Sequence, residues 1–306
     1  MSPPGPHRGI PLPPPLRPGD RVRLVAASSA LREQERLRAG LALLQDWGLV
    51  VEDGFDPSRC WGYLAGDDPR RLADLVLPGH GEAPALRACV RGGWGAARLL
   101  EHPLPLPAGW LLGFSDVTSL LWAQQAQGHG GGIHGPLVTT LADEPAWSQQ
   151  RLRALLFGEP VADLSGEGWR GGVAEGPLLV ANLTVATHLL GTPHLPRLEG
   201  AVLVLEDVGE APYRVDRMLT HWRLCGALQR LAAIGFGRFS DDGEDAAGDG
   251  GDGRFSTEQV LRERTADLGV PVVGGLEVGH GPGNAALPLG VWARLDGSTG
   301  RLSLLG

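Results

Sequence analysis

The sequence has few of the residues that hold metal ions or build disulfide frameworks. Its 306 residues include only three cysteines, Cys60, Cys89 and Cys225, and no two of them have Cys-x-x-Cys spacing. An odd number of scattered cysteines indicates reduced thiols in a cytoplasmic protein and argues against a disulfide scaffold. His-Glu-x-x-His and zinc-like ligand clusters are also absent. We therefore expect a protein that needs neither a metal ion nor another cofactor.

Long apolar segments and an excess of positive charge are lacking as well. No apolar run reaches membrane-spanning length. The first 20 residues carry eight prolines in place of the apolar core of a secretory signal peptide. The formal net charge of −8 argues against a broad nucleic-acid-binding face. We expect a cytoplasmic protein without membrane or nucleic-acid partners, and a proline-rich tail over residues 1–18.

Apolar runs and helical patterns alternate from residue 19 to about residue 155. Leu37, Leu41 and Leu44, for example, recur at helical spacing after a short apolar run, and Gly48 closes their pattern. Such alternation predicts a parallel α/β sheet with helices on both faces.

The pattern changes in the second part of the chain. Over residues 170–306, glycine-rich apolar stretches surround one clear helical pattern, "VDRMLTHWRLCGALQRL". We predict a second, smaller domain that is β-rich and barrel-like, with the linker between Glu144 and Gly171. Residues 240–256 hold six acids whose spacing does not fit a calcium loop, so we expect a solvated surface loop there.

One serine stands between an apolar run and a helical pattern. Ser115, in "LLGFSDVTSLLWAQ", precedes Val117, Leu120 and Leu121, which share a helix face. It is either an N-cap or a nucleophile on a tight turn, beside the free backbone N–H of Asp116 at the helix N-terminus. The Asp116 carboxylate is expected to cap the helix. The Gly-x-Ser-x-Gly pattern of α/β-hydrolases is not met, because Val117 takes the last position.

A glycine-rich turn offers a second backbone donor. Gly92, Gly93 and Gly95 lie between a strand pattern and a helix pattern in "VRGGWGAARLL", where bare amides can approach a ligand. Their order is not G-x-G-x-x-G, and no acidic residue follows at the distance that a dinucleotide site requires. We interpret this turn as the partner of Asp116 in an oxyanion hole, with Gly93 as the donor.

A serine nucleophile needs an imidazole, and the imidazole needs a carboxylate. Two of the nine histidines are flanked by glycines, His134 in "GGGIHGPL" and His280 in "EVGHGPGN", and their surroundings do not separate them. The apolar run "AVLVLED" ends in Glu206, which needs a partner if the strand is buried. That partner is either an imidazole or an arginine, Arg214 or Arg217.

Several motifs in one order give the chain a family resemblance. They are "GYLAGDDPRRLADL", "VRGGWGAARLL", "GFSDVTSL", "HGPL", "LVLEDVGEAPYRVDRML" and "GLEVGHGPGNAALPLG", from about Tyr63 to Gly290. Together they resemble the LD-carboxypeptidase family, the cytoplasmic murein tetrapeptide carboxypeptidases. The resemblance implies a flavodoxin-like N-terminal domain, a smaller C-terminal β-rich domain, a site between them, and a homodimer.

The resemblance also assigns roles to residues. It implies that Ser115 is the nucleophile, that His280 and not His134 is the base, and that Glu206 orients the imidazole. One departure is that Val180 and Ala181 precede Asn182, where relatives often carry Gly-Gly-Asn. The candidates for contact with substrate are Arg91, Gly92, Trp94, His134, Asn182 and Arg214.

The activity implied by the resemblance is that of a serine peptidase. It would release the C-terminal D-alanine of murein tetrapeptide, a small peptide substrate, through an acyl-enzyme during peptidoglycan recycling. Arg91, Arg214 and Arg217 are candidates for binding the free carboxylate, because a guanidinium pairs with a carboxylate in a bidentate manner. The alternative for each, favoured for Arg217, is a pair with a nearby acid. The alternative is a self-immunity peptidase of the microcin C type, which uses the same triad on a peptide-nucleotide antibiotic. An aromatic-lined base pocket would favour that alternative.

Overall fold

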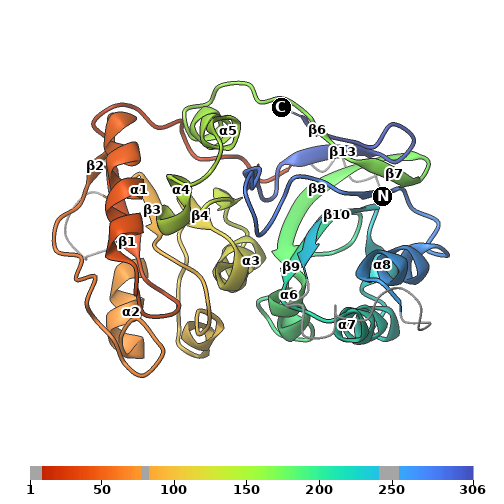
Figure 1. Cartoon of the computed structure of the whole chain (residues 1–306), viewed down its shortest axis with the longest axis horizontal. Helices are drawn as coiled ribbons and strands as arrows, with labels where there is room; N and C mark the ends of the chain where they lie inside the picture. Colours follow the sequence, from red (N-terminus) through yellow and green to blue (C-terminus); the bar gives the residue numbers. More distant parts are fainter. Residues whose placement is uncertain (1–8, 77–82, 241–254, 306) are drawn as a thin grey trace, which may run out of the picture.

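The computed structural model describes residues 9–76, 83–240 and 255–305. Two sheets lie next to each other, each with its own helices (Figure 1). The acidic stretch of the predicted surface loop, residues 241–254, lies outside the described residues. In the described parts of the chain no helix combines the length and apolar character needed to span a membrane.

The first sheet is flavodoxin-like, as expected. Its order is β12-β5-β4-β3-β1-β2, in which β2-β1-β3-β4-β5 is the flavodoxin strand order. These strands run parallel, and only β12 is antiparallel. Both faces are covered, so β3 and β4 are buried along their whole length. The strands are β1 (Arg21–Val25), β2 (Val50–Val51), β3 (Leu86–Cys89), β4 (Trp110–Gly113), β5 (Gly132–His134) and β12 (Leu287–Pro288).

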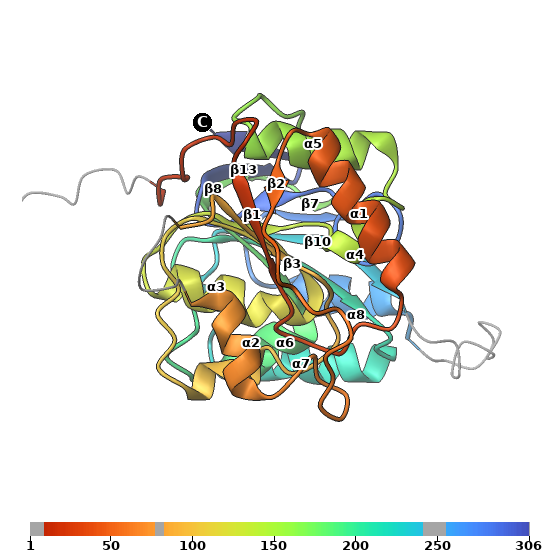
Figure 2. The ribbon, with the colours of Figure 1, turned by 90° about the vertical axis from the view of Figure 1, so that its left-hand side faces the viewer.

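Helices cover both faces of this sheet (Figure 2). One face carries α1 (Gln34–Asp46), α4 (Val138–Leu141) and α5 (Ala146–Leu156). The other carries α2 (Asp68–Leu75), the 3-10 turn η1 (Ala97–Glu101) and α3 (Thr118–Ala126). Helix α3 is buried almost throughout because it also packs against the second sheet and its helix α6. We call β1–β5 and these helices the first half of the molecule.

The second sheet has the order β6-β14-β13-β8-β9-β10-β11-β7. The run from β8 to β11 is parallel, and the outer pairs are antiparallel. The sheet is curled, since β10 and β11 contact β13 without being its neighbours in the sheet. The strands are β6 (Leu164–Ser165), β7 (Glu167–Arg170), β8 (Val173–Asn182), β9 (Val202–Val208), β10 (Ala233–Ser240), β11 (Val272–Gly274), β13 (Trp292–Asp296) and β14 (Arg301–Leu305).

Helices α6 (Leu183–Leu189), α7 (Pro212–Leu224) and α8 (Thr257–Thr265) lie together beside this sheet (Figure 1), and the short turn η3 (Leu228–Arg230) follows α7. The helical pattern in the sequence predicts α7 alone. We call the second sheet with these helices the second half.

The two halves are tied together at several points of the chain. Strand β12 comes late in the sequence but pairs with β5 of the first sheet. From α3, the indole Nε1 of Trp122 donates to the carbonyl of Val180 on β8 at 3.0 Å. The main chain itself passes between the halves after α5 and before β6. The sequence-based boundaries, 19–155 and 170–306, stay predictions.

The described part of the proline-rich tail packs against the body of the protein. The N–H of Ile10 donates to the carbonyl of Gly290 at 3.0 Å, and that of Leu16 to the carbonyl of Leu156 at 2.8 Å. Trp110 Nε1 donates to the carbonyl of Pro14 at 2.9 Å. Because proline fixes φ, such a segment loses little backbone entropy when it is bound in an extended form.

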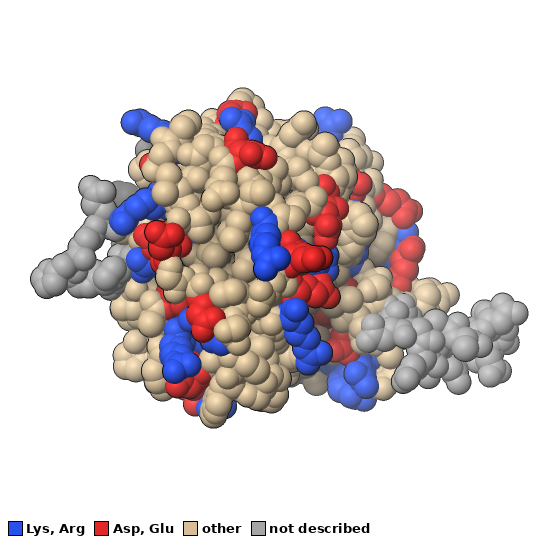
Figure 3. All heavy atoms as spheres, turned by 60° about the vertical axis from the view of Figure 1, so that its left-hand side comes forward, with Lys and Arg blue, Asp and Glu red and all other residues tan. Residues whose placement is uncertain are grey.

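Charged side chains of both signs are interspersed on the face drawn in Figure 3. The sequence contains no lysine, so all 27 of its permanently charged basic residues are arginines. Many of these arginines pair with nearby acids, such as Arg153 with Glu159 at 2.8 Å and Arg294 with Glu175 at 2.5 Å. Exposed pairs of this kind contribute little to stability.

Candidate active site

Ser115 opens the 3-10 turn η2 (Ser115–Val117), which joins β4 to α3. Its φ of 62° makes it the only residue other than glycine with positive φ in the described parts of the chain. This conformation costs a non-glycine residue about 1–2 kcal/mol. The side chain caps neither η2 nor α3, and Oγ lies 3.2 Å from Nε2 of His280. The N-cap interpretation of Ser115 is therefore wrong.

His280 lies between Ser115 and a buried carboxylate. Its Nδ1 is 2.7 Å from Oε2 of Glu206, and its backbone N–H donates to the same oxygen at 3.2 Å. A carboxylate at Nδ1 places the ring proton there and leaves Nε2 free to accept the hydroxyl proton of Ser115. Glu206 lies on β9 and is fully buried. The structure thus brings together the three side chains that the resemblance selected.

The arginine alternative for Glu206 is wrong. Arg214 pairs with Glu210 at 3.6 Å, and Arg217 lies over the ring of Tyr213 at 5.5 Å. The partner of Glu206 is His280.

The loop that carries His280 is held by the first half. Two backbone N–H groups, of Gly283 and Asn284, donate to Oε2 of Glu144 at 2.7 and 2.9 Å. Oδ1 of Asn284 in turn accepts the N–H of Gly279 at 2.9 Å. A Cβ on Gly279 would lie 2.5 Å from the Glu206 carboxylate, so only glycine fits there. The buried Glu144, between α4 and α5, was not among the predicted residues.

The glycine-rich turn packs directly against Ser115. A Cβ on Gly92 would lie 3.2 Å from Ser115 Oγ. Gly93 has a φ of 110°, and its neighbour Trp94 donates its backbone N–H to Ser29 Oγ at 3.0 Å. Within the described residues, the N–H groups of Gly93 and Asp116 have no hydrogen-bond partner in the protein. Both are therefore free to donate to a bound oxygen.

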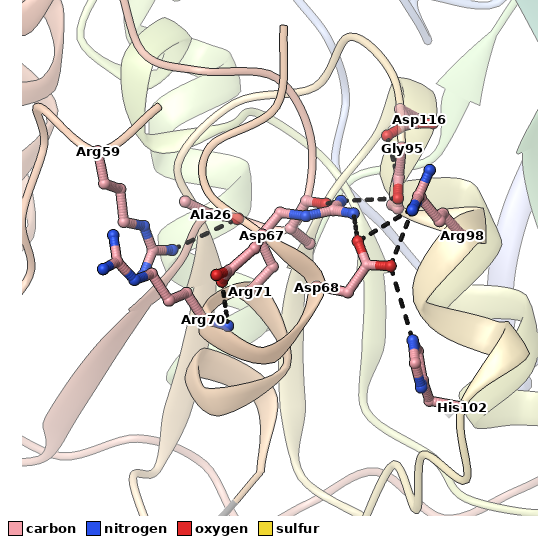
Figure 4. Close-up of polar contacts among 12 residues, drawn as sticks. Ala26, Arg59, Asp67, Asp68, Arg70, Arg71, Gly95, Arg98, His102 and Asp116 are labelled. Carbon is pink, nitrogen blue, oxygen red and sulfur yellow. Dashed lines mark hydrogen bonds and ion pairs between the residues drawn. The ribbon is translucent and has the colours of Figure 1, made fainter. Parts of the chain in front are cut away.

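Behind the glycine turn, a polar network fixes its position (Figure 4). The fully buried Arg71 donates to the carbonyl of Ala27 at the end of β1 and to that of Gly95 at 2.7 Å. It also pairs with Asp68 at 2.6 Å. These bonds connect the end of β1, the start of α2 and the glycine turn.

Asp116 belongs to the same network. Its carboxylate was expected to cap the following helix, and it does not. Its carboxylate accepts the N–H of Ala96 at 2.9 Å, at the end of the glycine turn. Burial raises the pKa of this carboxyl. The expected cap is therefore wrong, and the side chain links η2 to the glycine turn.

A cleft of about 420 Å³ opens at Ser115 and His280. It lies at the carboxyl ends of β1, β3 and β4, where ligands bind in folds of this class. Its lining consists of Leu31, Arg32, Glu33, Arg36, Arg91, Gly92, Gly93, Phe114, Ser115, Leu137, Thr139, Thr140 and His280.

The structure separates the predicted substrate-contact residues into two groups. Arg91 and Gly92 line the cleft, and Trp94 lines a hollow beside it. His134, Asn182 and Arg214 line neither.

The three residues outside the cleft have other surroundings. His134 is fully buried behind the ring of Phe114, and burial lowers its pKa to about 3. Asn182 caps α6 and donates to Asp207 at 2.8 Å. Arg214 lies on the surface of α7.

Sequence reasoning missed most of the cleft lining. Arg32, Glu33 and Arg36 follow β1, and Thr139 and Thr140 follow β5. The carboxyl-edge rule for parallel sheets would have indicated the loop after each strand.

Comparisons with known proteins agree with this geometry. Residues 22–135 match the model of an LD-carboxypeptidase N-terminal domain, and residues 175–295 match that of an LD-carboxypeptidase C-terminal domain. A putative carboxypeptidase of Synechocystis sp. is 46% identical and covers 95% of this chain and 96% of its own length. The murein tetrapeptide carboxypeptidase of Pseudomonas aeruginosa is 35% identical and covers 91% of this chain and 94% of its own length.

Two solved structures resemble this one over most of their length. A muramoyltetrapeptide carboxypeptidase from Oxalobacter formigenes has a TM-score of 0.79 and 25% identity, and the match covers 92% of this chain and 97% of that one. The microcin C7 self-immunity protein MccF, in an inactive mutant apo state, has a TM-score of 0.81 and 19% identity, with 96% and 98% covered. The second likeness concerns the fold alone.

Proposed function

Because the chain belongs to the LD-carboxypeptidase family, we propose that it is a serine carboxypeptidase that removes the C-terminal D-alanine from murein tetrapeptide. The observation that carries this proposal is the continuous contact from Ser115 Oγ to His280 Nε2, at 3.2 Å, and from His280 Nδ1 to Glu206, at 2.7 Å. An alcohol, an imidazole and a buried acid in this order form the arrangement used for nucleophilic attack on amides.

In the first step, His280 Nε2 takes the hydroxyl proton of Ser115, and Oγ attacks the carbonyl carbon that precedes D-alanine. The resulting oxyanion accepts hydrogen bonds from the backbone N–H groups of Asp116 and Gly93. One such donor is typically worth about 3 kcal/mol of transition-state stabilisation. Glu206 stabilises the imidazolium that forms.

In the second step, His280 gives its proton to the amine of D-alanine, and the C–N bond breaks. This leaves an acyl-enzyme ester on Ser115. Water enters, His280 removes one of its protons, and hydroxide attack on the ester releases the shortened peptide and regenerates the Ser115 hydroxyl.

A carboxypeptidase must also bind a free carboxylate, and Arg91 is in place for this. One of its Nη atoms donates to the carbonyl of Ala30 at 2.8 Å, which anchors the guanidinium in the wall of the cleft. The remaining donors are available to an anion. We further place the enzyme in the cytoplasm as a homodimer acting in peptidoglycan recycling, and light scattering of the purified protein will test the dimer.

The second candidate is a self-immunity peptidase of the microcin C type. Its support is the fold likeness to MccF together with two exposed aromatic residues, Tyr63 and Trp94, beside the cleft. These rings are a place where a nucleobase can stack.

One experiment separates the two activities. The purified protein is incubated with murein tetrapeptide and, separately, with an aminoacyl sulfamoyl-adenosine, and the products are followed by mass spectrometry. We expect release of D-alanine by the wild type and by the surface variant Ser58→Ala, and none by Ser115→Ala. Cleavage of the nucleoside compound alone would assign the protein to immunity, and no cleavage of either would refute both activities.

A further inference from the structure

A second cavity, of about 410 Å³, lies away from the active-site cleft and is nearly as large. None of the described residues lines both. Its walls are residues of α5, residues 160–165 of the chain that passes from the first half to the second, and Glu277 of the loop after β11. We call it the boundary cavity. The mechanism described above does not use it.

A buried guanidinium lies in the wall of the boundary cavity. Arg151 is only 8% exposed. Its Nε donates to the carbonyl of Ala286 at 2.9 Å, and its Nη1 donates to the carbonyl of Ala162 at 2.6 Å. Within the described parts of the chain, Nη2 is accessible but has no hydrogen-bond partner, and Arg151 forms no ion pair. Burial lowers the pKa of this side chain to about 10. A buried cation without an acid beside it is stabilised by an anionic partner.

The boundary cavity also offers a carboxylate. Glu277 is exposed, and its side chain makes no hydrogen bond or ion pair with any residue that the structure describes. The other acid of the lining, Asp163, already pairs with Arg301 at 3.6 Å. The cavity therefore combines a cation that has a free donor with an acid that has no partner.

Apolar groups form much of the remaining wall. They include the ring of Trp147, which is 38% exposed, and the side chains of Val161 and Leu164. A concave site of several hundred Å³ between two parts of a protein, with apolar walls and a few charged groups, is typical of small-molecule binding. The charges and the apolar wall together fit a zwitterion with an apolar side chain.

The boundary cavity touches both ends of the segment that carries His280. The N–H of Ala285 donates to the carbonyl of Glu277 at 2.8 Å, so these ends lie side by side. A Cβ on Gly283 would lie 2.6 Å from the ring of Trp147, and Arg151 holds the carbonyl of Ala286. A molecule in the cavity thus contacts the supports of the catalytic histidine without contacting its ring.

We propose that the boundary cavity is a regulatory site for a free amino acid with an apolar side chain. The carboxylate of this ligand binds Arg151, its ammonium group binds Glu277, and its side chain packs against Trp147. A bidentate grip needs two neighbouring guanidinium nitrogens, and only Nη2 is free. Because Glu277 lies beside Ala285, the second nitrogen is Nε, and binding withdraws it from the carbonyl of Ala286.

Loss of the bond to Ala286 loosens the segment that carries His280. Occupation of the boundary cavity therefore slows catalysis while the cleft stays open to substrate. This effect on rate rests on the proposed peptidase function, whereas the binding itself does not.

Binding is tested by calorimetric titration of the full chain with L-leucine, N-acetyl-L-leucine and L-leucinamide. We expect L-leucine to bind most tightly. Each of the other two lacks one charge and should bind roughly tenfold to a hundredfold more weakly, the value of a hydrogen bond to a charged group. Glu277→Gln should weaken binding of L-leucine by a similar factor and leave that of N-acetyl-L-leucine nearly unchanged. Glu101→Gln, an exposed glutamate of η1 outside the boundary cavity, is the matched control.

The effect on rate is tested with murein tetrapeptide as substrate. We expect saturating L-leucine to lower kcat of the wild type and of Glu101→Gln about tenfold or more with KM unchanged, as a small displacement of a catalytic group does. Glu277→Gln should need a correspondingly higher concentration of L-leucine for the same loss.

The outcomes separate this proposal from the peptidase activity. Absence of L-leucine binding, equal binding of the three compounds, or binding that Glu277→Gln leaves unchanged would overturn the regulatory site. A rise in KM with kcat unchanged would place L-leucine in the cleft and overturn it too. Absence of tetrapeptide cleavage would instead overturn the peptidase, and the titrations would still decide whether the boundary cavity binds an amino acid.

Discussion

Ser115 is held in a backbone conformation that its side chain disfavours. The left-handed φ of 62° points Oγ toward His280, and strain of this kind concentrates at sites where a side chain must be aimed. The strain is a property of this one residue. It can be measured with two substitutions that both remove the hydroxyl but differ in whether Cβ remains.

Comparing Ser115→Gly with Ser115→Ala measures the strain. Both variants lack the hydroxyl and should be inactive. Glycine tolerates the left-handed region, so we expect Ser115→Gly to have the larger free energy of unfolding, by about 1 kcal/mol after its greater unfolded-state entropy is allowed for. Urea denaturation gives this difference. An alanine variant as stable as the glycine variant would show that the turn relaxes.

His134 gives the protein a specific sensitivity to acid. Burial lowers its pKa to about 3, whereas an unfolded histidine titrates near 6.5. Between these values the unfolded chain binds a proton that the folded chain does not. The free energy of unfolding must therefore fall as the pH drops below about 6.5, by up to about 1.4 kcal/mol per pH unit.

Replacing His134 should remove this dependence. Neither ring nitrogen has a hydrogen-bond partner among the residues that the structure describes, so His134→Phe removes no polar contact seen there. We expect its unfolding free energy to decline less steeply from pH 6.5 to pH 4 than that of the wild type, as measured by urea titration at each pH. His129→Phe, a partly exposed histidine, is the comparison. Parallel pH profiles of wild type and His134→Phe would contradict the prediction.

The loop of residues 279–284 is placed by an element of the other half. Glu144, at the start of the segment that leads into α5, accepts two backbone N–H groups of this loop, and Ser148 of α5 donates to the carbonyl of Asn284 at 2.9 Å. Glu144 touches no reacting atom, so we regard it as a positioning residue for His280.

The effect of Glu144 should appear in kcat and not in substrate binding. We expect Glu144→Ala to lower kcat about tenfold to a hundredfold with little change in KM, because a displacement of about 1 Å costs on that order. Glu144→Gln keeps an acceptor oxygen and should recover part of the rate. Glu159→Ala, an exposed partner of Arg153, is the control. An equal loss for the glutamine and alanine variants would argue against positioning through these hydrogen bonds.

At the scale of the whole molecule, the halves should unfold together. The first sheet takes β12 from the end of the chain, and Leu287 on β12 is fully buried there. Hydrogen exchange at increasing urea should give β1–β5 and β8–β11 the same midpoint. Two midpoints separated by more than the error would show that the halves fold independently.

Local patterns in the sequence predicted most of the strands and helices of the first half, but they did not predict contacts between residues that are distant in the chain. The alternation over residues 19–155 predicted the parallel sheet, because strand and helix periods are local. Helix α6 was missed because it has only seven residues, and α8 because it is largely polar. Glu144 was missed because its partners lie 139 and 140 positions away.

The choice between His134 and His280 shows the same limit. Both are flanked by glycines, but His134 points into the core from β5, whereas His280 lies on a loop against Glu206. Burial decides between them, and burial depends on how the sheets pack. The family resemblance supplied the answer that local pattern could not.

The contact between Ser115 and His280 lies at the boundary between the halves, because the serine follows β4 of the first sheet and the histidine lies on the loop that leads from β11 of the second sheet to β12 of the first. The distance from Ser115 Oγ to His280 Nε2 therefore depends on how closely the two sheets approach each other. A compound that binds at this boundary, away from every reacting atom, would inhibit the protein by lengthening that distance by about 1 Å. Inhibitors need not resemble any peptide.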